Sequence, residues 1–130
     1  MRIHIRAPCR PTESLAKVKL AILNLFPDAS FVREEEIVEA TCDRADTFRD
    51  LIRTQKIRDT ARAEFRRGLH PSRIEFVLNK QAAYAGRVSF GTGAAPLGDI
   101  EVEIEDDRLD AVIDLLAEST VERAREKALR

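Results

Sequence analysis

Two short segments near opposite ends of the chain alternate polar and apolar residues, and they constrain the fold more than any other feature. They are Arg2–Ala7 and Ile100–Glu105. Alternation with a period of two is typical of a strand with one buried and one exposed face. If the two strands are neighbours, Arg2, His4 and Arg6 lie opposite the glutamates of the second strand, in cross-strand pairs worth a few tenths to about 1 kcal/mol each.

The segments that follow the first strand predict a helix and a hairpin. Thr12 followed by Glu13 opens a helix with apolar residues at helical spacing, and Pro27 with Asp28 stops it. A short hairpin is expected next, with one arm at Phe31 and Val32 and the other at Ile37, Val38 and Ala40, joined through Glu34 to Glu36.

A broken helix is predicted in the middle of the chain, with Asp43 as its N-cap. At 100° per residue, the apolar residues around Phe48 and those around Ala61 point in different directions, so one straight helix cannot bury both sets. We therefore predict a break at residues 54–56 and a second helix from about Ile57 to Arg67. Gly68 is expected to end this second helix in the left-handed conformation.

The last third of the chain predicts three strands and a final helix. The strands are 74–78, a short one at Val88 and Phe90, and 100–105, and the helix starts near Asp107. The fold class is thus α+β, with a single twisted, mainly antiparallel sheet and helices packed on one face. One domain is expected over residues 1–118, followed by a C-terminal extension over 119–130 that starts with a capping-box pattern.

Composition and motifs argue against a zinc site, a membrane span and a phosphate-binding loop. The chain has 130 residues, 44% apolar and 35% charged, with two cysteines and two histidines too far apart for a zinc site. It has no secretory segment and no long apolar run, which indicates a cytoplasmic protein without a membrane partner. The glycine-containing loop 91–98 lacks the ending of a phosphate-binding loop. We expect no catalytic residues, no enzyme activity, no small-molecule substrate, no cofactor and no metal.

The net charge of −1 hides a separation of charge along the chain. Residues 44–73 contain nine basic and four acidic residues, and residues 99–122 contain ten acidic residues and one arginine. Such asymmetry indicates either a basic face for an anionic partner or two surfaces that pair with each other inside the fold.

Basic residues of the broken helix are the best candidates for contacts with an anion. On a helix, Arg49, Arg53 and Lys56 lie within about 60° of one another, as does Arg67, and such a stripe can follow phosphates. For the other candidates a structural interpretation stays open beside RNA binding. Arg58 and Arg62 can form ion pairs with Asp59 and nearby acids. The polar triplet of Asn79, Lys80 and Gln81 can either contact base edges or cap a turn. The candidate RNA-binding residues are Arg49, Arg53, Lys56, Arg58, Arg62, Lys80, Gln81 and Arg87.

Four ordered motifs resemble those of an archaeal family catalogued as uncharacterised protein family 0201, which is grouped with RNA-binding domains. The motifs are Ile57–Arg62, Leu78–Ala83, Gly86–Phe90 and Pro96–Gly98, and the resemblance covers roughly Arg2 to Leu116. It implies a fold similar to that of the large-subunit ribosomal protein that binds 5S RNA, and no catalytic residues. Two hypotheses follow: a non-catalytic domain that associates with RNA, or a protein-interaction module that pairs with a second copy or another protein.

Overall fold

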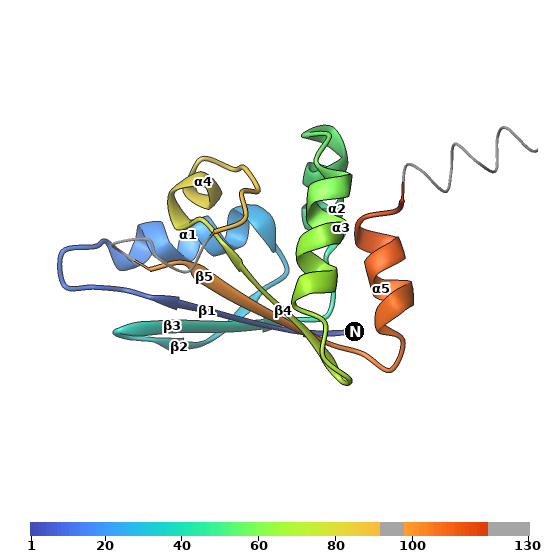
Figure 1. Ribbon diagram of the computed structural model, residues 1–130. Coiled ribbons are helices and arrows are strands. Elements are labelled where there is room, and N and C mark those ends of the chain that lie inside the picture. The colour runs from blue at the N-terminus through green and yellow to red at the C-terminus, as the bar shows by residue number, and fades with distance from the viewer. Residues whose placement is uncertain (92–97, 120–130) are drawn as a thin grey trace, which may run out of the picture.

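Five antiparallel strands form a single sheet in the computed structural model, which describes residues 1–91 and 98–119. Their order across the sheet is β2-β3-β1-β5-β4. The helices pack on one face, and no described helix crosses the other (Figure 1). The predicted α+β fold class is confirmed. The strands are β1 (Arg2–Pro8), β2 (Ser30–Glu34), β3 (Ile37–Cys42), β4 (Arg73–Leu78) and β5 (Ile100–Glu105).

β1 lies at the centre of the sheet, between β3 and β5. Its apolar residues Ile3, Ile5 and Ala7 are at most 1% exposed, so they form the middle of the core. β5 does lie beside β1, so the condition stated from the sequence is met and the basic face of β1 lies opposite the acidic face of β5. The partners in this register are Arg2 with Glu105, His4 with Glu103, and Arg6 with Glu101.

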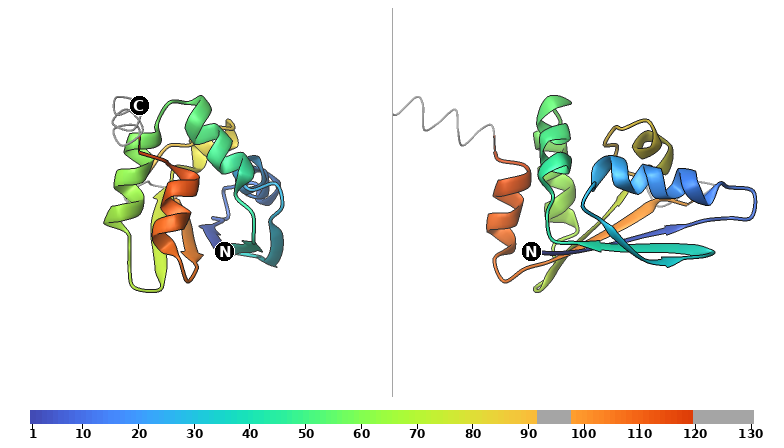
Figure 2. Two further views of the ribbon diagram at one scale, coloured as in Figure 1. Left: turned by 90° about the vertical axis from the view of Figure 1, so that its right-hand side faces the viewer. Right: turned by 180° about the vertical axis from the view of Figure 1, so that it is seen from behind.

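The helices cover the sheet in two groups. α1 and α4 lie side by side over one part of the sheet, and α2, α3 and α5 stand together over the other (Figure 1, Figure 2). No helix among the described residues is long and apolar enough to cross a bilayer. The helices are α1 (Leu15–Leu25), α2 (Asp46–Thr54), α3 (Arg58–Arg67), α4 (Lys80–Tyr84) and α5 (Leu109–Leu116).

The predicted break in the central helix is confirmed. α2 ends at Thr54 and α3 begins at Arg58. Between them Lys56 has a φ of 60°, a left-handed conformation that a non-glycine residue adopts only where the surrounding structure holds it. The break turns both helices so that each buries its own apolar face. The fully buried residues are Phe48 and Ile52 in α2, and Ala61 and Phe65 in α3.

Neither Thr12 nor Asp43 begins a helix, so both predicted starts lie too early in the chain. α1 begins after Ser14, whose hydroxyl accepts a hydrogen bond from the Lys17 backbone N–H at 3.4 Å. α2 begins after Ala45, with no side-chain cap. Ala45 is 4% exposed and belongs to the core. The chain is thus already buried at Ala45, before α2 begins. The start of α2 is set by this burial and not by the preference of Asp43 for the N-cap position.

The predicted strand at Val88 and Phe90 is wrong. The segment before it forms the short helix α4, capped by the Asn79 side chain, which accepts from the Ala82 N–H at 2.8 Å. Phe90 keeps only an isolated bridge to Leu78. The backbone of Val88 pairs instead with the side chain of Gln55, so an amide takes the place of a neighbouring strand.

The predicted left-handed conformation of Gly68 is also wrong, because its φ is −92°. Glycine is needed here for a different reason. The Glu75 N–H of β4 donates to the Gly68 carbonyl at 2.9 Å, and a Cβ on Gly68 would lie 1.7 Å from the Glu75 carbonyl oxygen. The two backbones therefore approach more closely than any side chain allows.

Replacing Gly68 with alanine is expected to lower the free energy of unfolding by about 2 kcal/mol, because β4 must shift away from the end of α3. Gly86 is a useful comparison. It has a φ of 78°, but a Cβ on Gly86 would meet no atom within 4 Å, so Gly86→Ala should cost only the backbone strain, about 1 kcal/mol. Urea unfolding of both variants tests this. An equal cost, or a neutral Gly68→Ala, contradicts the close approach.

Five of the six phenylalanines form the aromatic part of the core. Their ring centroids lie 5.0 to 6.2 Å apart, and most of the rings meet edge to face. Phe31 lies apart on β2 under the Lys19 side chain. The cluster joins α2 and α3 to β4. Its members are Phe26, Phe48, Phe65, Phe76 and Phe90.

The C-terminal part of the core comes from α5, whose apolar stripe is buried as expected. α5 ends at Leu116, and the described chain ends at Ser119. The predicted extension over residues 119–130 thus lies outside the described residues except for Ser119.

Candidate nucleic-acid interface

The break between α2 and α3 exposes two of the predicted cations. Arg53, in the last turn of α2, and Lys56, in the turn itself, are both exposed. Arg49 lies one turn earlier and pairs with the neighbouring Asp50 at 3.4 Å. Arg67 lies at the far end of α3 and pairs with Glu64 at 2.7 Å. The break therefore separates Arg67 from the other three residues of the predicted stripe.

Hydrogen bonds of the Gln55 side chain place a further cation, Arg87, near this turn. Its side-chain amide donates to the Val88 carbonyl at 2.8 Å, and its carbonyl oxygen accepts from the Val88 N–H at 2.8 Å. Lys56 and Arg87 follow and precede these paired residues in the chain, so the double hydrogen bond holds their backbones close together. We call Arg53, Lys56 and Arg87 the basic corner. All three side chains are exposed.

Arg58 and Arg62 join α3 to the end of α5. The Arg58 guanidinium donates to the Glu118 carboxylate at 2.7 Å. Arg62 donates to the Asp114 carboxylate at 2.7 Å and to the Ala117 carbonyl at 3.1 Å. The spacing in the sequence predicts acids near Arg58 in the chain as partners, whereas these partners are more than fifty positions away. These contacts hold α3 against the end of α5 and therefore favour the structural interpretation for both arginines.

Lys80 is buried, unlike the other predicted cations. Its side chain is 9% exposed and pairs with Glu13, itself 10% exposed, at 3.0 Å. The ammonium also donates to the Pro8 carbonyl at 2.6 Å. Asn79 caps α4, so the capping interpretation holds for that residue. Gln81 alone among the predicted polar triplet is exposed.

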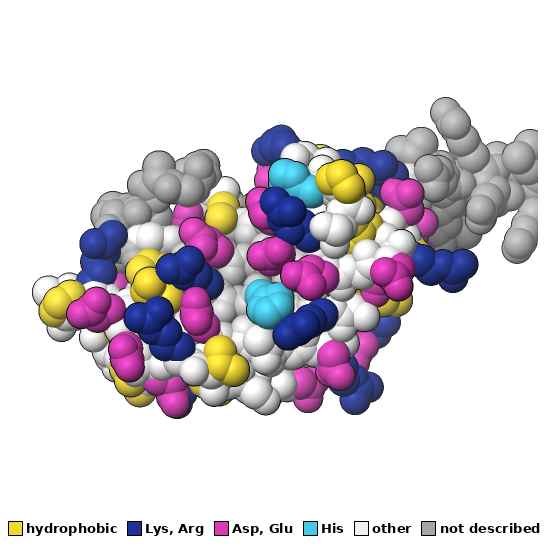
Figure 3. Space-filling model, turned by 90° about the horizontal axis from the view of Figure 1, so that it is seen from below, with side chains coloured by type: hydrophobic (Ala, Val, Ile, Leu, Met, Phe, Trp, Pro, Cys, Tyr) yellow, Lys and Arg dark blue, Asp and Glu magenta, His cyan; other side chains and the backbone are white. Residues whose placement is uncertain are grey.

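The open face of the sheet carries both signs of charge, as Figure 3 shows. The Arg6 and Arg73 guanidiniums pair with Glu39 at 3.7 Å and with Glu75 at 2.6 Å. The hydrogen bond from Arg73 holds the pKa of Glu75 below its usual range. A hollow of about 570 Å³ lies over this face, lined by residues of both signs. Acids and bases neutralise each other there, so the face offers no basic surface for phosphates.

The described residues show no cluster of side chains arranged to hold a metal ion. No group of three or more His, Cys, Asp or Glu side chains among them is placed to hold a metal ion. Burial raises the pKa of the Cys42 thiol to about 11, so the thiol is protonated at neutral pH and is a poor nucleophile. The Arg108 N–H and the terminal ammonium of Met1 hold the pKa of Asp106 below its usual range.

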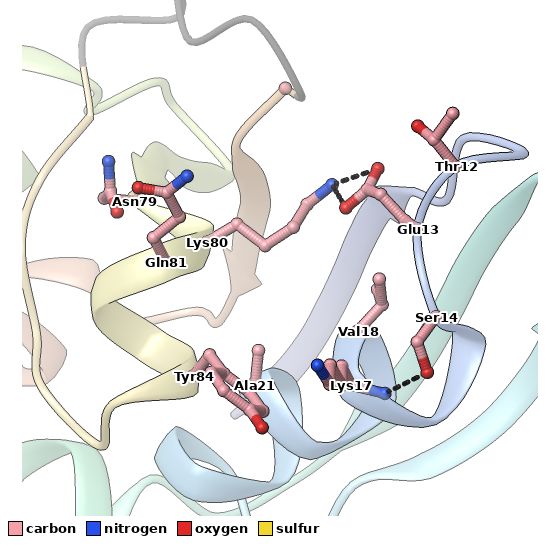
Figure 4. Close-up of a pocket in the computed structure, with 11 residues that line it drawn as sticks. Thr12, Glu13, Ser14, Lys17, Val18, Ala21, Asn79, Lys80, Gln81 and Tyr84 are labelled. Carbon is pink, nitrogen blue, oxygen red and sulfur yellow. Dashed lines mark hydrogen bonds and ion pairs between the residues drawn. The ribbon is translucent and has the colours of Figure 1, made fainter.

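A groove between α1 and α4 is the feature that the sequence patterns did not predict. It has a volume of about 560 Å³, with Val18 and Ala21 of α1 and Tyr84 of α4 among its lining residues (Figure 4). The pair of Lys80 and Glu13 bridges its two walls. These residues lie 67 positions apart, and no sequence signal links them.

A model of the protein family described as RNA binding matches residues 2–115. The chain belongs to this family. The resemblance to uncharacterised protein family 0201 is confirmed as well, because the curated relatives carry that name. A UPF0201 protein of Metallosphaera sedula is 36% identical over 127 residues, which cover 92% of this chain and 89% of the relative.

Solved structures of the family have the same fold. A crystal structure of the UPF0201 protein from Methanococcus jannaschii is 34% identical, with a TM-score of 0.84 over 92% of this chain and 95% of that chain. Another uncharacterized UPF0201 protein is 36% identical, with a TM-score of 0.87 and the same coverage. The likeness to the 5S-RNA-binding ribosomal protein stays a prediction.

Proposed function

We propose that this protein associates with RNA and that the basic corner contacts the phosphates. One observation carries the proposal. Within residues 1–91 and 98–119, no ion pair involves Arg53, Lys56 or Arg87, although all three are exposed. Most of the other predicted cations have carboxylate partners. The charge of the corner is therefore available to an anion from solution.

The chemistry of the corner suits a phosphate backbone. Arginine and lysine bind phosphate through charge-assisted hydrogen bonds, and binding releases condensed counterions from the nucleic acid. Arg49 extends the corner by one turn of α2, and its exposed pair with Asp50 is weak enough to exchange for a phosphate. The family description, RNA binding, agrees with this assignment. Arg58, Arg62 and Lys80 are better explained by the contacts that hold the fold together.

The variant Arg53→Glu/Lys56→Glu is expected to bind a mixed pool of structured RNA at least about tenfold more weakly at 50 mM salt than the unchanged protein. The slope of log affinity against log salt between about 50 and 200 mM should become shallower by about 2, because two phosphate contacts are lost. Filter binding or fluorescence anisotropy measures both quantities.

A matched control changes the net charge equally at other places. Arg10→Glu/Arg44→Glu replaces two exposed arginines, one before α1 and one before α2, and should keep nearly all of the affinity. Thermal unfolding checks that both variants fold. If both variants lose affinity equally, the overall charge binds RNA and the corner does not. If no RNA binds even at 50 mM salt, the proposed function is wrong and protein partners become the better hypothesis.

A further inference from the structure

The groove between α1 and α4 has the size and composition of a binding site for a small ring. Its volume of about 560 Å³ falls within the range of pockets that take small molecules, roughly 300–1,000 Å³. Val18 and Ala21 supply apolar lining from α1, and the lining also includes Asn79, the N-cap of α4, and Gln81 in its first turn (Figure 4). A mostly apolar lining with a few polar groups is typical of sites for flat, partly polar ligands.

The walls of this groove are tied together at both ends of α4. At one end, Lys80 reaches across to the Glu13 carboxylate at 3.0 Å and to the Pro8 carbonyl at 2.6 Å. At the other end, the Asn24 amide of α1 donates to the carbonyls of Ala83 at 3.0 Å and Tyr84 at 3.1 Å. A ligand thus enters a groove that is already formed, and little ordering of the protein opposes binding.

Tyr84 offers a stacking surface in this groove. It is 45% exposed, whereas four of the five clustered phenylalanines are buried and Phe90 is partly buried. The Lys17 ammonium lies over one face of the Tyr84 ring, 5.8 Å from its centre, which leaves the other face for stacking. An exposed aromatic ring beside a cation is the combination with which proteins hold a nucleotide, the base on the ring and the phosphate at the cation.

The electrostatics of the groove favour an anionic ligand. Within the part of the chain that the structure describes, Lys17 has no carboxylate partner, and the first turn of α1 contains no acidic residue. Among the described residues that line the groove, Glu13 is the one acid, and it pairs with Lys80. The Tyr84 ring is therefore next to a net positive charge.

The groove is also joined to the basic corner by a short piece of chain. Only Ala85 and Gly86 separate Tyr84 from Arg87, a span of at most about 11 Å between their Cα atoms. Asn24 holds the first end of this piece and Gln55 holds the second. An RNA strand on the corner can therefore reach the groove with a nearby nucleotide.

We infer that the groove binds one unpaired base of the RNA, stacked on Tyr84, with its phosphate at Lys17. The inference rests on the proposed function and goes beyond it, because it assigns to this protein a contact with a base in a single-stranded or looped-out segment. Stacking tolerates any base, since every base has an aromatic face. The site selects unpaired nucleotides rather than a sequence.

Tyrosine fluorescence tests this inference directly. Tyr84 is the only tyrosine and the chain has no tryptophan, so the emission reports the groove alone. We would titrate the protein with adenosine 5′-monophosphate and with a hexa-adenylate RNA at 50 mM salt, using N-acetyltyrosinamide to correct for nucleotide absorbance. Both ligands are expected to quench the emission with saturation. Lys17→Glu should raise the concentration needed for half-quenching at least about tenfold.

Variants at Tyr84 give a second readout by anisotropy of labelled hexa-adenylate. Tyr84→Ala should weaken binding about tenfold or more, and Tyr84→Phe should bind nearly as the unchanged protein does, because only the ring is needed. The side chain is partly exposed, so neither variant is expected to unfold. Equal binding by Tyr84→Ala, or unchanged emission at saturating hexa-adenylate, would overturn the base site.

The corner variant Arg53→Glu/Lys56→Glu separates this inference from the proposed function. Quenching by the mononucleotide should persist in that variant, while its affinity for structured RNA falls. If structured RNA binds equally to the variant and quenching persists, the base site stands and the corner is wrong. The opposite result is a corner variant with reduced RNA affinity and an unchanged protein whose emission neither ligand quenches. It would support the basic corner as the phosphate contact and contradict the base site in the groove.

Discussion

Replacing Lys80 with methionine is expected to lower the free energy of unfolding by about 3–5 kcal/mol. Among its contacts, the Lys80 ammonium pairs with the Glu13 carboxylate at 3.0 Å and donates to the Pro8 carbonyl at 2.6 Å, both of them largely shielded from solvent. Methionine has a similar length but no charge, so the variant would leave the Glu13 carboxylate buried without its counter-ion. The cost comes from this stranded charge more than from the loss of attraction, because desolvating an unpaired carboxylate is expensive.

Two further variants separate these contributions in urea unfolding. Glu13→Leu/Lys80→Met removes both charges and should cost less than Lys80→Met alone, about 1–2 kcal/mol, because no carboxylate at position 13 is left without its counter-ion. Arg44→Met breaks the exposed pair with Asp46, which has a distance of 3.4 Å, and should cost less than about 1 kcal/mol. A double variant as unstable as Lys80→Met would show that packing, and not the stranded carboxylate, dominates.

Phe48→Ala should lower the free energy of unfolding by about 3–5 kcal/mol. The Phe48 side chain is fully buried, and its ring centroid lies 5.1 Å from that of Phe26, 6.2 Å from that of Phe65 and 5.7 Å from that of Phe76. Truncation therefore removes one ring from three edge-to-face contacts and leaves a cavity where α1, α2, α3 and β4 meet. Partial collapse around this cavity is limited because the three neighbouring rings come from different parts of the chain, namely the end of α1, α3 and β4.

Phe31→Ala is the matched control for Phe48. The same atoms are removed, but Phe31 is only partly buried and stacks under Lys19 at 4.9 Å, so the expected cost is about 1–2 kcal/mol. Thermal and urea unfolding of both variants give the two values. Equal costs would show that the aromatic cluster is not the centre of stability. Binding of RNA should survive in Phe31→Ala if the basic corner is the contact surface.

Local patterns in the sequence predict most of the architecture correctly. The alternation in Arg2–Ala7 and Ile100–Glu105 predicts two strands and the face that each of them buries, because a one-residue shift would bury every charge on them. The different directions of the apolar residues around Phe48 and Ala61 predict the break between α2 and α3. In these places the local preference and the need for burial agree.

Predictions failed where a distant residue competes with a local preference. Val88 and Phe90 have the composition of a strand, but the Gln55 side chain takes the hydrogen bonds that a neighbouring strand would have made. Gly68 follows the pattern of a helix C-cap, yet its use is to let the Glu75 carbonyl approach. Neither partner is visible from spacing, since the contacts cross from one element to another.

For the candidate site, too, local patterns predict some features and the folded structure decides the others. Residue patterns predict the fold class, the buried face of each of the two alternating strands and the set of cations in residues 44–73. They do not predict which of these cations are free to meet a partner, because that depends on the folded chain. Arg58, Arg62 and Lys80 find carboxylates more than fifty positions away, whereas Arg53, Lys56 and Arg87 find none among the described residues. The physical reason is that charge pairing depends on distances in space, and folding sets these distances by burying the apolar faces first.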